Sequence, residues 1–182
     1  MKAIKSAQRI LLALSDKLQV KMFKKNVYIA DSLIAASMRL YHVALPAVVL
    51  IYNSTDISYD VSNGNYLHSV GIHVFLDSNQ MRMFNPASGK TEDPCDEAAW
   101  EAAAVKNGYS GLDYMQVILD VIAPNGVTRQ ERLIDNVHLS RITQVTAGET
   151  VELISLTENS TRVAGHQGIN VQYYEIEQGR LN

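Results

Sequence analysis

The chain of 182 residues contains a single cysteine, Cys95. No disulfide can therefore form within the chain, and a zinc site built from several cysteines is excluded. The sequence also lacks any run of about 18 to 20 apolar residues, the length that a membrane-spanning helix needs. We therefore expect a protein that folds without disulfides and has no membrane as a partner.

An excess of basic residues is missing as well. Lys and Arg total 16 against 19 Asp and Glu, so the formal net charge is -3. Proteins that grip the nucleic-acid backbone need a basic surface, which this composition does not supply. The only local basic cluster, Lys17, Lys21, Lys24 and Lys25, is typical of a solvated turn.

No sequence motif for catalysis or cofactor binding is present. The glycine-rich nucleotide loops, the Gly-x-Ser-x-Gly elbow and the His-Glu-x-x-His zinc motif are all absent. Cys95 precedes an expected helix start, where a thiol can be activated, but no further residue supports a nucleophile. We expect no catalytic residues, no cofactor-binding residues and no metal ligands; the protein is not expected to be an enzyme.

The histidines give little support for a metal site. His68 and His73 are five positions apart on one expected strand, so they point to opposite faces and cannot share a metal ion. His138 and His166 could meet across a sheet formed by the last third of the chain. Partly exposed histidines on strands are common, so we do not assign a metal to that pair.

Hydrophobic periodicity predicts one α+β domain over residues 1–182. Apolar residues make up 47% of the chain, enough for a core. Residues 46–52 form a short apolar strand after Pro46. Residues 66–76 alternate: Val70, Ile72, Val74 and Leu76 lie on one face, and polar or small residues lie mostly on the other. Such alternation is typical of an antiparallel sheet with one buried face.

Helical spacing appears at the N-terminus and in the centre of the chain. Residues 2–18 place Ile4, Ala7, Leu11, Leu14 and Leu18 on one face. Asp31 and Ser32 are typical caps of a further helix. A central helix pair is expected at residues 96–107 and 110–122; the second helix has an apolar face of Leu112, Met115, Ile118, Leu119 and Ile122. The predicted fold is an antiparallel sheet with the N-terminal helix and this pair packed on it.

The remaining segments are predicted from shorter patterns. Residues 19–30 are expected to form a hairpin that turns at Lys24-Lys25-Asn26. Residues 53–65 are expected to be a loop or a wide turn. The last third is expected to contain three strands, at 137–145, 151–158 and 168–176, separated by turns at Ala147-Gly148 and Asn159-Ser160.

A long loop is expected at residues 78–95, with Pro86, Gly89 and Pro94. It carries three large apolar residues, Met81, Met83 and Phe84, among Ser, Asn, Pro and Gly. One interpretation is that these side chains continue the preceding strand or tuck onto the core. The other is that they form an apolar contact for another subunit, a role that methionine suits. The sequence leaves both open.

The order of elements resembles the tail terminator (tail completion) proteins of the phage neck in long-tailed bacteriophages. The matching parts are the helix Ile4 to Leu18, the strand at Pro46-Ala47-Val48-Val49-Leu50, the strand Val70 to Leu76, the helix Leu112 to Ile122 and a closing strand Gly168 to Tyr174. The resemblance covers most of the chain by order of elements, and its motifs are of low specificity.

That resemblance implies a structural virion protein of α+β fold whose subunits close into a ring, commonly a hexamer. The ring would cap the tail tube at its head-proximal end and join the head connector, with DNA passing through the lumen unbound. The protein would assemble in the host cytoplasm and reside in the virion neck. Alternatives are another neck or baseplate adaptor, or a small enzyme with a site assembled from scattered residues.

Overall fold

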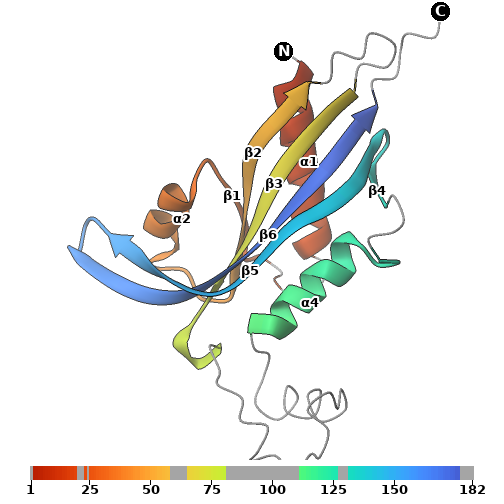
Figure 1. Ribbon diagram of the computed structural model, residues 1–182. Helices are drawn as coiled ribbons and strands as arrows, with labels where there is room; N and C mark the ends of the chain where they lie inside the picture. Colours follow the sequence, from red (N-terminus) through yellow and green to blue (C-terminus); the bar gives the residue numbers. More distant parts are fainter. Residues whose placement is uncertain are drawn as a thin grey trace, which may run out of the picture.

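A computed structural model describes residues 2–19, 23, 25–57, 65–80, 111–126 and 131–176. These residues build one six-stranded sheet of order β1-β2-β3-β6-β5-β4, with helices on both faces (Figure 1). In chain order the elements are α1 (Lys2–Leu18), β1 (Val27–Ala30), α2 (Leu33–Leu40), β2 (Ala47–Ile57), β3 (Asn65–Leu76), η2 (Ser78–Gln80), α4 (Gly111–Ile122), β4 (Arg132–Ile134), β5 (Val137–Ser155) and β6 (Ser160–Ile176). The α+β class is thus confirmed.

The sheet is mixed rather than antiparallel throughout, which corrects the prediction. β1 pairs with β2 in parallel, from Val27 opposite Val48 to Ala30 opposite Ile51, while the other pairs are antiparallel. The predicted hairpin over residues 19–30 is therefore wrong for its second half. A turn does form there, because the Asn26 amide donates to the carbonyl of Phe23 at 2.7 Å, but the strand that follows pairs with β2 and does not fold back on the residues before the turn. Instead the Asn26 side chain donates to the carbonyl of Ala44 at 3.1 Å and its own carbonyl accepts from Val48.

The α1 face of the sheet is the face that carries Val70, Ile72, Val74 and Leu76. All four side chains are buried, as their alternation predicts, and they pack with residues from α1 and α4. On α1 the buried apolar residues are Ala7, Ile10, Leu11, Leu14 and Leu18, whereas Ile4 is exposed. The predicted stripe is therefore confirmed except at its first residue, which lies in the first turn of the helix.

Helix α4 packs on the same face with a slightly rotated stripe. Gly111, Tyr114, Met115, Ile118 and Ile122 are buried, and Leu119 is partly buried against the same core. Leu112 is exposed, so its predicted place in the core is wrong. The reason is Gly111: a Cβ there would come within 2.9 Å of the Leu76 side chain, so this glycine allows the helix start to lie close on the sheet. The other expected helix, 96–107, lies outside the described residues.

The α2 face is the opposite face, carrying Ser69, Gly71, His73 and Phe75. Helix α2 covers part of it through Ala36 and Leu40, which join a second apolar cluster with Val49, Phe75 and Leu153. The expected cap of α2 is confirmed, because the Ala35 amide donates to Ser32 Oγ at 3.1 Å.

Strands β5 and β6 form a long hairpin that extends past the end of β3 (Figure 1). The two strands predicted at 137–145 and 151–158 are one strand that ends at Ser155. Ala147-Gly148 is not a turn but part of a bulge between Thr146 and Glu149, where Gly148 has φ +81. The turn at Asn159-Ser160 is confirmed. We call residues 150–164, beyond the β3 pairing, the arm.

Strand β2 also exceeds its prediction. It continues to Ile57 through the polar residues that were expected to be a loop, because a register shift after Tyr52 keeps them paired with β3. The expected loop at 78–95 begins with the short helix η2, and residues 81–95 lie outside the described part. None of the described helices is long and apolar enough to cross a membrane.

Candidate functional site

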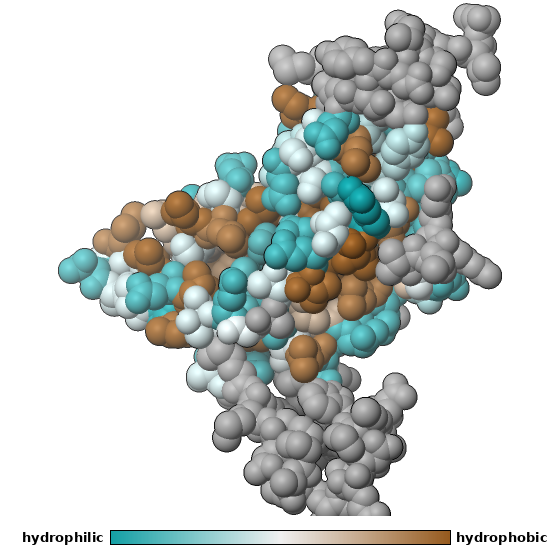
Figure 2. All heavy atoms as spheres, in the orientation of Figure 1, coloured by the Kyte–Doolittle hydropathy of each residue, from teal (hydrophilic) through white to brown (hydrophobic). Residues whose placement is uncertain are grey.

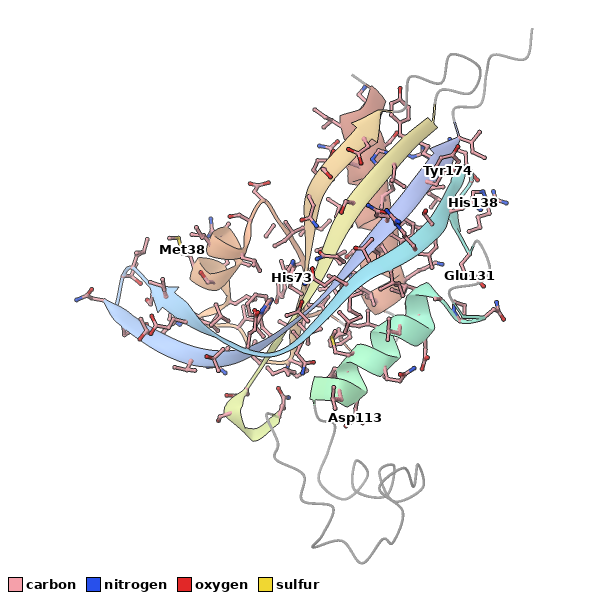
Figure 3. The ribbon with its side chains drawn as sticks, viewed as in Figure 1. Met38, His73, Asp113, Glu131, His138 and Tyr174 are labelled. Atoms are coloured by element: carbon pink, nitrogen blue, oxygen red, sulfur yellow. The ribbon has the colours of Figure 1, made fainter. Side chains whose placement is uncertain are left out.

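The sequence-predicted contact residues Met81, Met83 and Phe84 all lie outside the described residues. Their role stays a prediction. The expectation for His68 and His73 is confirmed, since alternate positions on β3 place them on the α1 and α2 faces respectively. His138 and His166 do not meet: His138 is paired with Tyr174 near one end of the sheet and His166 with Glu149 farther along β6. Figure 3 shows His73 central in the sheet and apart from His138 and Tyr174.

A chain of titratable groups lies on the α2 face. His73 Nδ1 is 3.0 Å from His166 Nε2, and His166 Nδ1 is 3.3 Å from Glu149 Oε2. The three residues come from β3, β6 and β5, so three adjacent strands of the sheet contribute one group each. His166 is buried and its ring also contacts that of Phe75, whereas the Glu149 side chain is 61% exposed.

One glycine makes room for the first ring of this chain. A Cβ at Gly71 would collide with His73 Nε2, whereas a Cβ at Gly168 would be in ordinary contact with His73 Nδ1, at 3.4 Å. The imidazole therefore lies over the bare backbone of β3 at Gly71. This placement aims Nδ1 along the sheet towards His166.

The surroundings of His73 favour its neutral form. Burial, and secondly the proximity of His166, lower the pKa of His73 from 6.5 to about 4. The Glu149 carboxylate accepts a hydrogen bond from His166 Nδ1, which leaves His166 Nε2 to face His73. The chain can thus pass a proton between its members, which is the chemistry that this arrangement permits.

A second polar chain is buried on the α1 face. His68 Nε2 lies 3.0 Å from Glu175 Oε2, and His68 Nδ1 lies 2.8 Å from Thr55 Oγ1. Ser6 of α1 donates to the other Glu175 oxygen at 3.0 Å. Because His68 is 0% and Glu175 5% exposed, this network fastens α1 to the sheet and does not present groups to a ligand.

Apolar side chains are exposed around α2 and the arm (Figure 2). On α2, Leu33, Ile34 and Met38 are 40%, 68% and 40% exposed; on the hairpin, Leu156 and Val163 are 73% and 55% exposed. Met38 lies on the outer side of α2 in Figure 3. Exposed apolar residues gathered on neighbouring elements are typical of protein contact surfaces.

One arginine fastens the arm to the rest of the molecule. Arg162 donates to the carbonyls of Tyr41 and Val43, at 3.4 and 3.2 Å, and pairs with Asp77 at 3.1 Å. Two further contacts lie nearer the hairpin tip: Tyr41 with Ser160 and His42 with Glu158. The arm is therefore attached along one side, while Val163 on its other side stays exposed.

No group of three or more metal-binding side chains gathers among the described residues. Sequence reasoning missed the contact between His73 and His166, although it placed His73 on the right face. The missing information was the pairing of β3 with β6, which are separated by about half of the chain and which no local pattern joins. Gly71 was the available signal, because an isolated glycine in a strand often marks close packing over the backbone, and a Cβ at this position would collide with His73.

No protein-family model matches this chain, and a search among curated proteins finds no match.

Proposed function

We propose that this chain is a structural subunit of a closed homo-oligomeric ring, and that the ring is the tail terminator at the head-proximal end of a bacteriophage tail tube. The observation that carries the proposal is the presence of exposed apolar residues on two separate surfaces, the outer side of α2 and the side of the arm that carries Val163. The occupant of these surfaces in the ring is a neighbouring copy of the same chain. The phage assignment rests on the order of elements given above.

The arrangement of the exposed apolar residues on α2 supports a contact between subunits. Ile34 and Met38 are one helical turn apart, so they form a stripe on the side of α2 that does not touch the sheet. A soluble monomer gains nothing from two large apolar residues on this outer side. A neighbouring subunit that covered them would gain about 25 cal/mol for each Å² removed from water.

The arm supports a ring geometry. It extends past the body of the sheet. In the proposed ring it would contact a surface of the neighbouring subunit other than that neighbour's own arm. A contact between two different surfaces is heterologous, and heterologous contacts close into rings when the rotation between subunits allows it. The net charge of -3 is compatible with a lumen through which DNA passes without being held.

The apolar surface of α2 is tested by charge substitution. Ile34→Lys with Met38→Lys should abolish self-association and leave the far-ultraviolet circular dichroism and thermal midpoint unchanged, since both side chains are exposed. The matched control is Leu12→Lys, because Leu12 is 57% exposed on the outer side of α1. Sedimentation velocity that shows the same association for the double variant and the control would contradict this use of α2.

Met81, Met83 and Phe84 are proposed as part of the contact with a subunit or with the tail tube. Replacing all three by Ser should leave the monomer folded and reduce incorporation into tails. Loss of the monomer fold would instead assign these side chains to the core. Unchanged incorporation with an intact fold would remove them from the contact.

A further inference from the structure

The Glu149–His166–His73 chain lies at the base of the arm. The pairing of β6 with β3 ends at Gly165, one residue from His166, and Glu149 ends the bulge of β5. Beyond these residues β5 and β6 continue as a two-stranded ribbon. A bond between Glu149 and His166 therefore spans the two strands at the point where the arm leaves the sheet.

The two imidazoles meet edge to edge. Their planes are within 15° of parallel and their centres are 5.2 Å apart. The N···N distance is 3.0 Å, and the remainder of the distance between the ring centres equals the two distances from a ring centre to its own nitrogen. The two centres and the two nitrogens therefore lie nearly on one line, and the rings are nearly coplanar. A metal ion held by both nitrogens would need the rings to converge at an angle with the nitrogens farther apart. The geometry fits a shared proton instead.

Counting protons gives the states of this pair. With both rings neutral, His166 carries its proton on Nδ1 next to Glu149, and its bare Nε2 accepts from His73 Nδ1. When one proton is added, His166 becomes the cation beside the carboxylate and its Nε2 donates. His73 then changes tautomer: its proton is on Nε2, and its Nδ1 accepts the hydrogen bond from His166. A second proton would place two N–H groups against each other at 3.0 Å.

Among the described residues, the other charged groups of the neighbouring elements either have their own partners or lie away from His166. The β2 residues opposite Phe75 and His73, Ala47 and Val49, are apolar, and the buried residues of α2 carry no charge. Asp77 and Arg162 pair with each other, Arg141 donates to Gln172, and Arg39 is exposed.

The remaining carboxylates of these strands are placed elsewhere. Asp56 lies at the far end of β2, opposite Leu67, while Glu152 and Glu175 alternate onto the other face of β5 and β6. Glu149 is thus the described carboxylate within hydrogen-bond distance of His166.

We propose that Glu149, His166 and His73 form a one-proton switch that tightens the base of the arm when the pH falls below neutral. Uptake of one proton converts the Glu149–His166 hydrogen bond into a charge-assisted one across the two strands. His73 stays neutral and accepts from the charged ring. The low pKa of His73, about 4, agrees with the exclusion of a second proton. The inference concerns the arm within one chain and stands without the ring.

The switch is tested on the isolated chain by nuclear magnetic resonance. Nitrogen shifts of the imidazoles between pH 7.5 and 5 should show His166 gaining a proton while His73 stays neutral and changes tautomer. Two independent titrations near the ordinary histidine value would overturn the shared-proton assignment.

Amide exchange tests the effect on the arm. Protection factors of Val151 and Ala164, corrected for intrinsic exchange, should rise roughly three- to fivefold on going from pH 7.5 to 5. Glu149→Gln should abolish this rise; because Glu149 is largely exposed, the fold should survive. His42→Gln is the control, since His42 pairs with Glu158 at the arm tip at 3.5 Å. A rise that persists in Glu149→Gln, or that vanishes in His42→Gln, would overturn the proposal.

Discussion

Side chains on the two faces of the sheet differ in chemistry. On the α1 face, most alternate residues of β2, β3 and β6 are apolar and buried under two helices; Gln167, Thr55 and the His68–Glu175 pair are polar. On the α2 face, glycines, amides and histidines lie between apolar residues. Single substitutions should therefore act mainly through packing on the first face and through polar contacts on the second.

Ile72→Ala should lower the free energy of unfolding by about 2 to 5 kcal/mol, because Ile72 is 0% exposed and its removal leaves a cavity between the sheet and its helices. The matched control is Leu112→Ala, which removes a similar side chain that is 53% exposed and should cost less than about 0.5 kcal/mol. Urea denaturation measures both values. Equal costs would show that α4 packs with a different face.

Tyr173→Phe should not destabilise the protein and should raise the free energy of unfolding by up to about 1 kcal/mol. The Tyr173 hydroxyl is buried and has no hydrogen-bond partner among the described residues, and its burial raises the pKa of the phenol. The comparison is Tyr41→Phe, which removes a hydroxyl bonded to Ser160 at 2.8 Å and should cost stability. A loss of stability in Tyr173→Phe would mean that this hydroxyl has a partner.

The pH dependence of folding at His73 has a definite sign. Its pKa is lowered in the folded state to about 4, so between pH 6.5 and 4 the unfolded chain binds a proton there that the folded chain refuses. The contribution of His73 is thus fully present above pH 6.5 and is lost as the pH falls towards 4. The free energy of unfolding should therefore fall less between pH 6.5 and 4 in His73→Gln than in wild type. The difference should be roughly 1 to 2 kcal/mol after allowance for solvent screening, measured by urea denaturation at each pH.

At the scale of secondary-structure elements, attachment of the arm depends on Arg162. Arg162→Ala should increase amide exchange in residues 150–164 and lower stability by about 1 to 3 kcal/mol, because it leaves the Tyr41 and Val43 carbonyls without their donor. Arg132→Ala is the control. Its ion pair with Asp135 is equally short, at 3.0 Å, but both side chains are exposed, so the cost should be near zero. Similar exchange in the two variants would contradict this role of Arg162.

Local patterns predicted the elements better than their connections. The alternation of Val70, Ile72, Val74 and Leu76 and the stripe on α1 follow from burial of one face, which repeats along a short segment. Strand β1 pairs in parallel with β2, and Asn26 just before it bonds to Ala44 and Val48. No periodic pattern in the sequence signals such contacts. Gly148 reads as a turn because positive φ is needed in both turns and bulges.

For the candidate site, the face on which a side chain lies could be predicted from the sequence, but its contacts could not. The parity of β3 placed His68 and His73 on opposite faces, since side chains on a strand alternate. Which residue each one meets depended on the partner strand, and β6 lies far along the chain. The exposure of Ile34 and Met38 could not be predicted, because the sequence does not reveal which side of α2 contacts the sheet.

At the scale of the whole molecule, the proposed ring concerns the side of the subunit that carries α2 and the arm. The body of the sheet is covered on its α1 face, while α2 and the arm extend to one side with apolar residues exposed. A ring of such subunits would bury α2 and the arm at each contact.

The most direct test of the ring is the mass and shape of the purified protein over a wide concentration range. Sedimentation velocity should show monomers converting to one larger species as the concentration rises, without partial assemblies between the two. Averaged electron micrographs should show that this species is a closed ring, with six copies as the expected number. A chain that remains monomeric up to about 1 mM, where a contact worth about 4 kcal/mol would be half formed, would contradict the account.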